Sequence, residues 1–182
     1  PGFIDMHFHG AGNYLVDQGS EALAGLCNLL PSYGVTSFLP TVVPKKPEPH
    51  RELVAALAAG EYTGTRISGF FLEGPFLKLT GALPPDALVD LTAERVEALK
   101  AACRPYQAIF GVAPDVDGAV DLIELMADNP AAPGERAAVF VTHTAASVEE
   151  TQAGIDAGIT HATHFYDVFP VPDERDPGVR PC

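Results

Sequence analysis

The sequence predicts an α/β fold in which strand–helix units repeat around a parallel sheet. Three observations predict it. Short apolar runs alternate with stretches of helical period, Gly and Pro separate the two, and the runs are nearly continuous in apolar character, as strands covered on both faces are. With 182 residues, 47% of them hydrophobic, the chain can bury one substantial core, so we expect a single domain over residues 1–182.

The predicted elements follow one another in strand–helix order. Strands are expected at residues 3–8, 35–40, 67–72, 108–112, 138–142 and 160–165, each a brief apolar run. Helices are expected at 21–30, 51–59, 93–103 and 119–127, where apolar side chains recur on one face. Ser147 and Glu150 form a capping box that opens a last helix, and Gly158 closes it.

Two Pro-rich loops, at 74–91 and 166–182, follow the carboxyl ends of predicted strands, where α/β enzymes place functional groups. Six strand–helix units are fewer than the eight of a closed (β/α)8 barrel, and an open doubly wound sheet is the alternative. The Gly-rich phosphate turn of dinucleotide-binding sheets is absent after the first strand.

Charge and composition exclude several classes of partner. The formal net charge is −13, which disfavours nucleic acids and anionic membranes. We see no apolar run of membrane-spanning length and no signal peptide, so we expect a cytoplasmic protein. Cys27, Cys103 and Cys182 form no paired framework, and we expect no disulfides.

Histidine and glutamate side chains lie at the carboxyl ends of four predicted strands. His7 and His9 are two residues apart and therefore project to one face of the first strand, in the spacing of metal ligands. Glu73, His143 and His164 follow the third, fifth and sixth strands. One such residue alone is more often a satisfied core or rim group. Together they predict a site for one or two divalent cations, Zn²⁺ first and Fe²⁺ as the alternative.

The other two histidines are expected to lie elsewhere. His50 stands in a polar, Pro-rich segment and is expected to be a solvated surface residue. His161 is at odd spacing from His164, so it should point to the opposite face and serve packing or outer-shell contacts.

Such a site suits hydrolysis of an amide, because divalent cations lower the pKa of a water molecule and polarise a carbonyl. A proton must also reach the leaving amine, and we expect a carboxylate on a later strand to carry it.

Several motifs spread over the chain are typical of one enzyme family. They are Pro-Gly-Phe-Ile-Asp-Met-His-Phe-His-Gly at 1–10, Leu-Glu-Gly-Pro-Phe at 72–76, Ala-Pro-Asp at 113–115, Thr-His at 142–143, Thr-His-Phe-Tyr at 163–166 and Arg-Asp-Pro-Gly at 175–178. In these motifs the chain resembles the N-acetylglucosamine-6-phosphate deacetylase family of the metal-dependent amidohydrolase superfamily.

The resemblance implies a (β/α)8 TIM-type barrel that converts N-acetylglucosamine-6-phosphate to glucosamine-6-phosphate and acetate. It implies that Glu73, His143 and His164 hold the principal metal and that His7 and His9 hold a second one. Arg175 would contact the sugar phosphate, a role that suits its bidentate guanidinium. The resemblance also implies a homodimer when the protein is complete.

Departures from the family pattern affect the expected substrate site. Phe71 and Leu83 replace histidines, and Asp167 and Val168 replace Asn-Ala after the second metal histidine. Asp167 would repel a phosphate group unless it is paired or protonated. A related amidohydrolase that acts on another amide or amine is therefore an alternative.

The chain is expected to be an incomplete barrel domain of about six units. Strands seven and eight and the family's small β-sandwich are missing, and the catalytic aspartate is expected beyond Cys182. We therefore expect weak or no deacetylase activity from residues 1–182 alone. A non-catalytic metal-binding partner domain is the alternative from another functional class.

Overall fold

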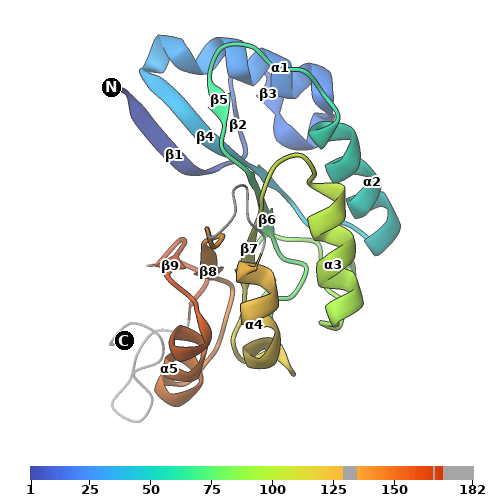
Figure 1. Ribbon diagram of the computed structural model, residues 1–182, viewed down its shortest axis with the longest axis vertical. Helices are drawn as coiled ribbons and strands as arrows, with labels where there is room; N and C mark the ends of the chain where they lie inside the picture. The colour runs from blue at the N-terminus through green and yellow to red at the C-terminus, as the bar shows by residue number, and fades with distance from the viewer. Residues whose placement is uncertain (129–134, 166, 170–182) are drawn as a thin grey trace.

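Parallel strands form a curled sheet that makes up half of a barrel (Figure 1). The computed structural model describes residues 1–128, 135–165 and 167–169. The sheet runs in the order β1-β4-β6-β7-β8-β9, and β5 pairs with β4 beside that path. Along this path each strand pairs with the one that precedes it in the chain, so the strand order runs in one direction across the sheet. The doubly wound alternative is therefore wrong, because such a sheet reverses its strand order at a switch point.

The elements of the sheet and of the helical layer alternate along the chain. The sheet strands are β1 (Phe3–Phe8), β4 (Val35–Val42), β5 (Arg66–Ile67), β6 (Phe70–Glu73), β7 (Ala108–Val112), β8 (Val139–Val141) and β9 (His161–Ala162). The α-helices are α1 (Ser20–Leu29), α2 (Pro47–Ala58), α3 (Ala93–Ala102), α4 (Ala119–Ala127) and α5 (Val148–Ala157). Short elements complete the described chain: the hairpin β2 (Gly10–Ala11) with β3 (Tyr14–Leu15), and the 3₁₀ turns Val16–Gln18, Leu30–Tyr33 and Pro85–Ala87.

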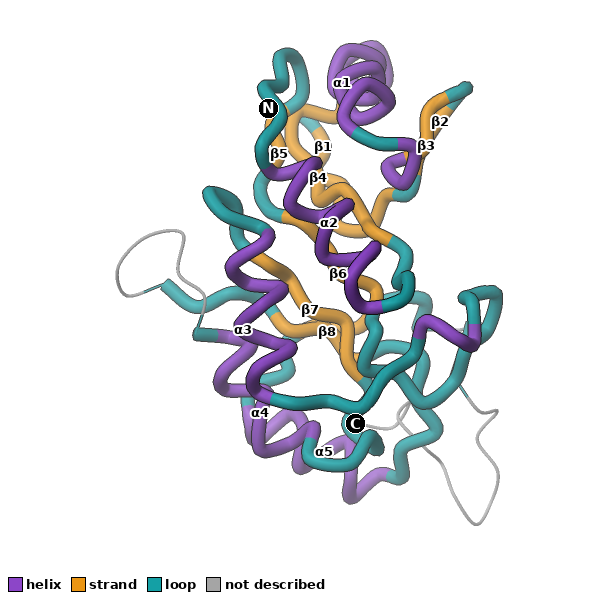
Figure 2. Tube along the Cα trace, turned by 90° about the vertical axis from the view of Figure 1, so that its right-hand side faces the viewer, coloured by secondary structure: helices purple, strands orange, loops and turns teal. Residues whose placement is uncertain are grey.

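Both faces of the central strands are buried, which explains their nearly continuous apolar sequences. Phe70 and Leu72 of β6 belong to the large core between the sheet and the helices, together with Phe110 of β7. Phe71, between them, points to the other face and joins a small cluster that contains Phe140 of β8. The helices line the outer side of the curl, as Figures 1 and 2 show. The inner cluster therefore lies on the concave side of the sheet.

Two strand predictions need correction. The run 67–72 does not form one strand: β5 ends at Ile67, and β6 begins at Phe70 after the break at Ser68 and Gly69. Both pieces pair with β4, through Phe38 and Thr41 respectively, so one strand bends past two segments. The sixth strand is only two residues long, because the backbone leaves the sheet after Ala162.

The helix predictions hold, with one difference at α2. It begins at Pro47 and not at residue 51, because a proline in the first turn lacks an N–H that would have no helical partner there. The capping box of α5 is confirmed. The Ser147 N–H donates to Glu150 Oε2 at 2.8 Å, and the Glu150 N–H donates to Ser147 Oγ at 3.2 Å. Gly158 ends the helix with a φ of 127°.

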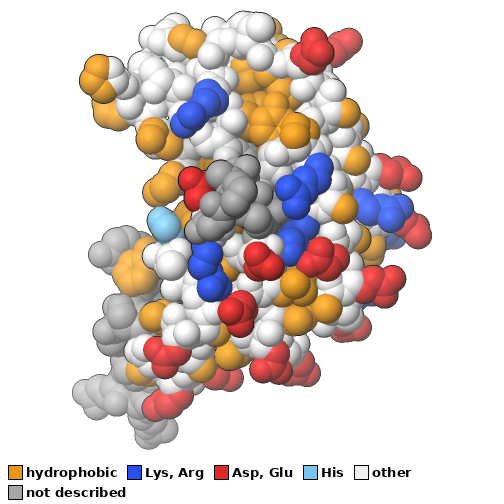
Figure 3. All heavy atoms as spheres, viewed as in Figure 1, with side chains coloured by type: hydrophobic (Ala, Val, Ile, Leu, Met, Phe, Trp, Pro, Cys, Tyr) orange, Lys and Arg blue, Asp and Glu red, His pale blue; other side chains and the backbone are white. Residues whose placement is uncertain are grey.

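The surface of the described chain is acidic and carries one apolar edge. Acidic side chains outnumber basic ones on the lower half of the face in Figure 3. Phe3 and Ile4 of the edge strand β1 are 73% and 66% exposed. Among the described residues, no helix is long and apolar enough to cross a bilayer.

A core substitution should show how strongly the stability of the fold depends on the layer between sheet and helices. Phe110→Ala should lower the free energy of unfolding by about 3–5 kcal/mol, since Phe110 is fully buried. The measurement is urea unfolding followed by circular dichroism. Phe3→Ala is the matched control and should cost less than about 1 kcal/mol, because Phe3 is largely exposed. Equal losses in the two variants would contradict this description of the core.

Candidate metal centre

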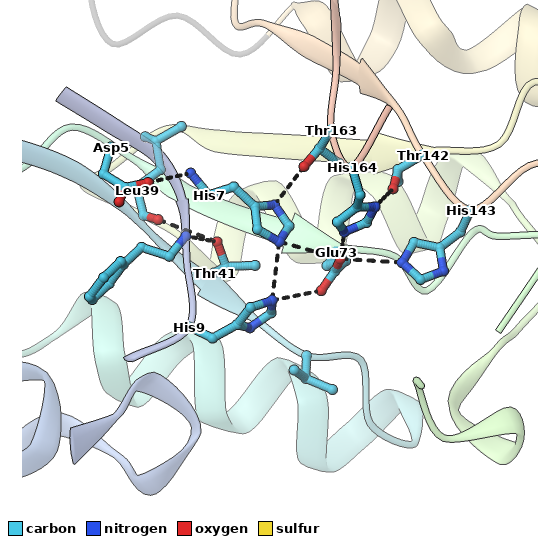
Figure 4. Close-up of polar contacts among 12 residues, drawn as sticks. Asp5, His7, His9, Leu39, Thr41, Glu73, Thr142, His143, Thr163 and His164 are labelled. Carbon is cyan, nitrogen blue, oxygen red and sulfur yellow. Dashed lines mark hydrogen bonds and ion pairs between the residues drawn. The ribbon is translucent and has the colours of Figure 1, made fainter. Parts of the chain in front are cut away.

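Five side chains from distant parts of the chain converge at the carboxyl ends of four strands (Figure 4). Their ligand atoms form two groups that share one carboxylate, and the atoms within each group lie within 4.8 Å of one another. The first group is His7, His9 and Glu73, and the second is Glu73, His143 and His164. The structure thus brings together all five residues that the sequence singled out.

The Glu73 carboxylate is the centre of the cluster and is almost fully buried, with 3% of its side chain exposed. All four histidines approach it through Nε2. The distances to Oε1 are 2.6 Å from His164, 3.3 Å from His143 and 3.4 Å from His7, and the distance to Oε2 is 3.0 Å from His9.

The sheet explains why Glu73 points inward. Side chains alternate between the faces of a strand, so Glu73 shares the concave face with Phe71, two residues earlier. Phe71 is fully buried and contacts the His7 ring edge-on, with ring centroids 4.8 Å apart. Phe71 therefore packs against a histidine of the cluster, and it is not among the residues that line the cavity described below.

The ring nitrogens that face away from the cluster also have partners. His143 Nδ1–H donates to the Leu79 carbonyl at 3.0 Å, and this carbonyl can only accept. His7 Nδ1 lies 3.1 Å from Thr163 Oγ1, and His164 Nδ1 lies 3.3 Å from Thr142 Oγ1. The carbonyl contact keeps a proton on His143 Nδ1 and turns Nε2 toward Glu73, which is the ring orientation of metal-ligating histidines.

The donor set fits a divalent cation. The Nε2 atoms of His7 and His9 are 3.1 Å apart. Two nitrogens bound at about 2.0–2.1 Å to one tetrahedral ion would be roughly 3.3 Å apart. Neutral imidazoles and a carboxylate are also ligand types that Zn²⁺ and Fe²⁺ accept.

The pKa shifts of Glu73 and His7 favour cation binding, and that of His9 opposes it. Burial alone would raise the pKa of Glu73, but hydrogen bonds from His143, His164 and His9 hold it well below its usual range. Burial lowers the pKa of His7 to about 4. The pKa of His9 is raised, chiefly by its hydrogen bond to Glu73. Glu73 is therefore ionised and His7 neutral near pH 7, as metal ligation requires, whereas a protonated His9 must release its proton before it can bind a cation.

A cavity of about 620 Å³ lies in front of the cluster. Its wall is largely apolar, and Asp17 and Asp167 are its acidic residues besides Glu73. Asp17 is paired with Lys45 at 3.2 Å and accepts the Val43 N–H at 3.3 Å. The apolar lining comes from Leu15, Val43, Ala82, Leu83 and Val168.

Three residues of the expected substrate site lie on the wall of this cavity. They are Leu83, Asp167 and Val168, and Asp167 is exposed. The Asp167 carboxylate accepts the Val168 N–H at 2.9 Å. Arg175 lies outside the described residues.

The expectation that His50 is solvated is wrong. His50 is 1% exposed, and neither ring nitrogen has a hydrogen-bond partner. Burial lowers its pKa to about 4. Its polar, Pro-rich neighbours forecast solvent exposure, but the segment is the first turn of α2, which packs against α3. His161 is outside the groups of ligand atoms and stacks on Phe140 with ring centroids 4.7 Å apart, which agrees with a packing role. The expectation that it points to the opposite face is wrong, because its partner Phe140 belongs to the cluster on the concave side.

Other residues that shape the centre carried only weak sequence signals. The repeated Thr-His pairs at 142–143 and 163–164 are the clearest one, because both threonines contact histidines of the cluster. Asp115 accepts hydrogen bonds from the Thr144 hydroxyl and, at 3.1 Å, from the Ala145 N–H. It therefore ties the loop after β7 to the segment that follows His143.

Comparisons with known proteins support the resemblance seen in the sequence. No protein-family model matches the chain. Curated relatives include an N-acetylglucosamine-6-phosphate deacetylase of Bacillus subtilis, 30% identical, and an N-acetylgalactosamine-6-phosphate deacetylase of Escherichia coli O157:H7, 29% identical. Each alignment covers 98% of this chain but only 46% and 48% of the relative, so the chain spans about half the length of the curated relatives it matches.

Solved structures give the same result. N-acetyl-D-glucosamine-6-phosphate deacetylase from Mycobacterium smegmatis superposes with a TM-score of 0.85 at 30% identity, over 98% of this chain and 50% of that one. An aspartate-to-alanine variant of that enzyme in complex with N-acetyl-D-glucosamine-6-phosphate gives 0.84, over 98% of this chain and 46% of that one. The suspected similarity to these hydrolases is thereby confirmed.

Proposed function

We propose, from the similarity to N-acetylglucosamine-6-phosphate deacetylases, that this chain is the metal-holding part of an enzyme that hydrolyses the N-acetyl amide of an amino-sugar 6-phosphate. Its substrate would be N-acetylglucosamine-6-phosphate and its products glucosamine-6-phosphate and acetate. The observation that carries the proposal is the buried Glu73 carboxylate with four histidine Nε2 atoms around it. The enclosing fold would be a (β/α)8 barrel, of which residues 1–182 supply the half described above.

Glu73, His143 and His164 would hold one cation, and His7 and His9 would hold a second with Glu73 as the shared ligand. Zn²⁺ is the first candidate and Fe²⁺ the second. Bound there, the cation would lower the pKa of a water molecule and polarise the acetyl carbonyl.

The chain's own residues would bind and orient the substrate. The apolar wall around Leu83 and Val168 would exclude bulk water from the acetyl group. Asp17 is paired with Lys45 and lies on the cavity wall, where it is placed to accept a hydrogen bond from a sugar hydroxyl. The proton for the leaving amine would come from a carboxylate in the half of the relatives that this chain does not span.

A second candidate function is hydrolysis of an N-acyl substrate without a phosphate. The specific observation is the charge of the cavity wall. Among the described residues that line it, Asp17 and Asp167 are acidic and none is Lys or Arg. Arg175 is the proposed phosphate contact and would favour the first candidate.

An assay with a substrate panel separates the two candidates. It uses a polypeptide that contains residues 1–182 and matches the relatives over their whole length, loaded with Zn²⁺. We expect acetate release from N-acetylglucosamine-6-phosphate, and the non-phosphorylated sugar should be turned over faster only if the second candidate is correct. A Zn²⁺-loaded polypeptide that releases acetate from neither compound would overturn the deacetylase proposal.

A further inference from the structure

We propose that Thr142 and Thr163 are positioning residues that hold the rings of His164 and His7 in the orientation that turns Nε2 toward the centre of the cluster. The inference rests on the proposed metal function. It assigns to two hydroxyl groups the task of orienting two of the ligands.

The two threonines link neighbouring ligands on the concave side of the sheet. Thr142 directly precedes His143, and its Oγ1 lies 3.3 Å from Nδ1 of His164 at the end of the next strand. Thr163 directly precedes His164, and its Oγ1 lies 3.1 Å from Nδ1 of His7. Each threonine therefore belongs to one ligand-bearing strand end and contacts the histidine of another, as Figure 4 shows.

A local backbone feature brings both members of each Thr-His pair to the site. Consecutive side chains of a regular strand point to opposite faces. His143 and His164 break this alternation, because their φ values are 47° and 40°, in the left-handed region that non-glycine residues seldom adopt. Residues held in such conformations gather at functional sites.

The hydrogen-bond chemistry explains why hydroxyl groups suit this task. The Leu79 carbonyl can only accept, so it holds the Nδ1–H of His143 and leaves Nε2 as the atom that can bind a cation. A threonine hydroxyl can accept from Nδ1–H when a cation occupies Nε2. It can also donate to Nδ1 when Nε2 carries the proton, as the 2.6 Å contact between His164 Nε2 and Glu73 Oε1 requires without a cation. Both hydroxyls can therefore hold the same ring orientation in either state. Thr142 is fully buried and Thr163 is 8% exposed, so water does not readily replace either hydroxyl.

The chain contains a matched pair outside the site. Thr160 Oγ1 lies 2.8 Å from Nδ1 of His161, and both residues are exposed. The pair has the same chemistry as Thr163–His7, but His161 takes no part in the cluster. Removal of the Thr160 hydroxyl is therefore the appropriate control.

The experiment measures tautomers and metal affinity in the 182-residue chain. ¹⁵N spectra of the imidazoles in the Zn²⁺-loaded protein report which ring nitrogen binds the cation and which carries the proton, and Zn²⁺ titration against a competing chelator gives the affinity. Thr163→Val should shift the Nδ1 signal of His7, because it removes the hydrogen bond at that nitrogen, and should weaken Zn²⁺ binding by about 10- to 100-fold. Thr142→Val should do the same to His164. Thr163→Ser should restore both readouts, and Thr160→Val should leave them unchanged.

Unchanged His7 signals together with unchanged Zn²⁺ affinity in Thr163→Val would overturn the inference. Failure of Thr163→Ser to restore the His7 Nδ1 signal and the Zn²⁺ affinity would also overturn it, since the effect would then come from packing and not from the hydroxyl. If the wild-type chain takes up no Zn²⁺, the proposed metal function fails. The ¹⁵N spectra of the metal-free chain still decide whether Thr163 is hydrogen-bonded to His7, because Thr163→Val would then shift the His7 Nδ1 signal and Thr160→Val would not.

Discussion

Glu73→Gln should abolish Zn²⁺ binding at both groups of ligands, with a loss of affinity of at least about 100-fold. Outer-shell partners of metal ligands typically contribute 10- to 100-fold, and Glu73 is itself a shared ligand candidate. Glutamine keeps the shape of the side chain but removes the negative charge that the four Nε2 atoms surround. The amide nitrogen of glutamine is also a hydrogen-bond donor, and it would replace a carboxylate oxygen that accepts hydrogen bonds or binds a cation.

The measurement is Zn²⁺ content after gel filtration, together with titration against a chelator. Glu97→Gln is the matched control, because Glu97 is half exposed and pairs with Lys100 on α3, away from the cluster. The control should bind as the wild type does. Retention of wild-type stoichiometry and affinity by Glu73→Gln would refute the proposed centre. A circular dichroism spectrum of each variant checks that the fold is intact.

The second large effect concerns His50 and acid. The folded protein holds the pKa of His50 at about 4, against 6.5 in the unfolded chain, so the unfolded state binds more protons between these values. His50 therefore contributes stability that is fully present above about pH 6.5 and is lost as the pH falls toward 4. The loss amounts to about 3 kcal/mol over that window, since one pKa unit corresponds to about 1.4 kcal/mol.

Urea unfolding in the presence of a chelator, at several pH values between 4 and 7, tests this expectation. His50→Phe should flatten the pH dependence by about that amount relative to the wild type. Near pH 7 it should be no less stable, because it removes two buried nitrogens that lack partners. The acid-dependent contributions of His7 and Glu73 are common to both proteins and cancel in the comparison. His161→Phe, at an exposed ring, is the control, and identical pH dependences for wild type and His50→Phe would contradict the assignment.

Local patterns were enough to predict much of the fold and the composition of the candidate centre. The sequence places His7 and His9 on one face of the first strand and Glu73 after the third, and the structure brings the three side chains into one group of ligand atoms. The bounds of β1, β7 and α4 also agree with the prediction. These features depend on neighbouring residues, whose pattern is visible in the sequence.

What could not be predicted depends on packing between distant segments. His50 is buried on a helix that packs against α1 and α3, and no pattern in its own polar segment predicts that burial. The acceptor for His143 is a backbone carbonyl at Leu79, which is placed because the Lys78 and Leu79 N–H groups both donate to the His143 carbonyl. The break at Ser68 and Gly69 arises because β4 pairs with β5 and β6 at different points of its length.

The contact between His7 and Thr163 joins residues 156 positions apart. Closing so long a stretch of chain costs entropy, so this contact should be among the last to form during folding. A cation that requires it would bind the native chain and not the unfolded one, and would raise the melting temperature with its concentration. The proposed metal centre would then stabilise the contact between the first and the last described strands.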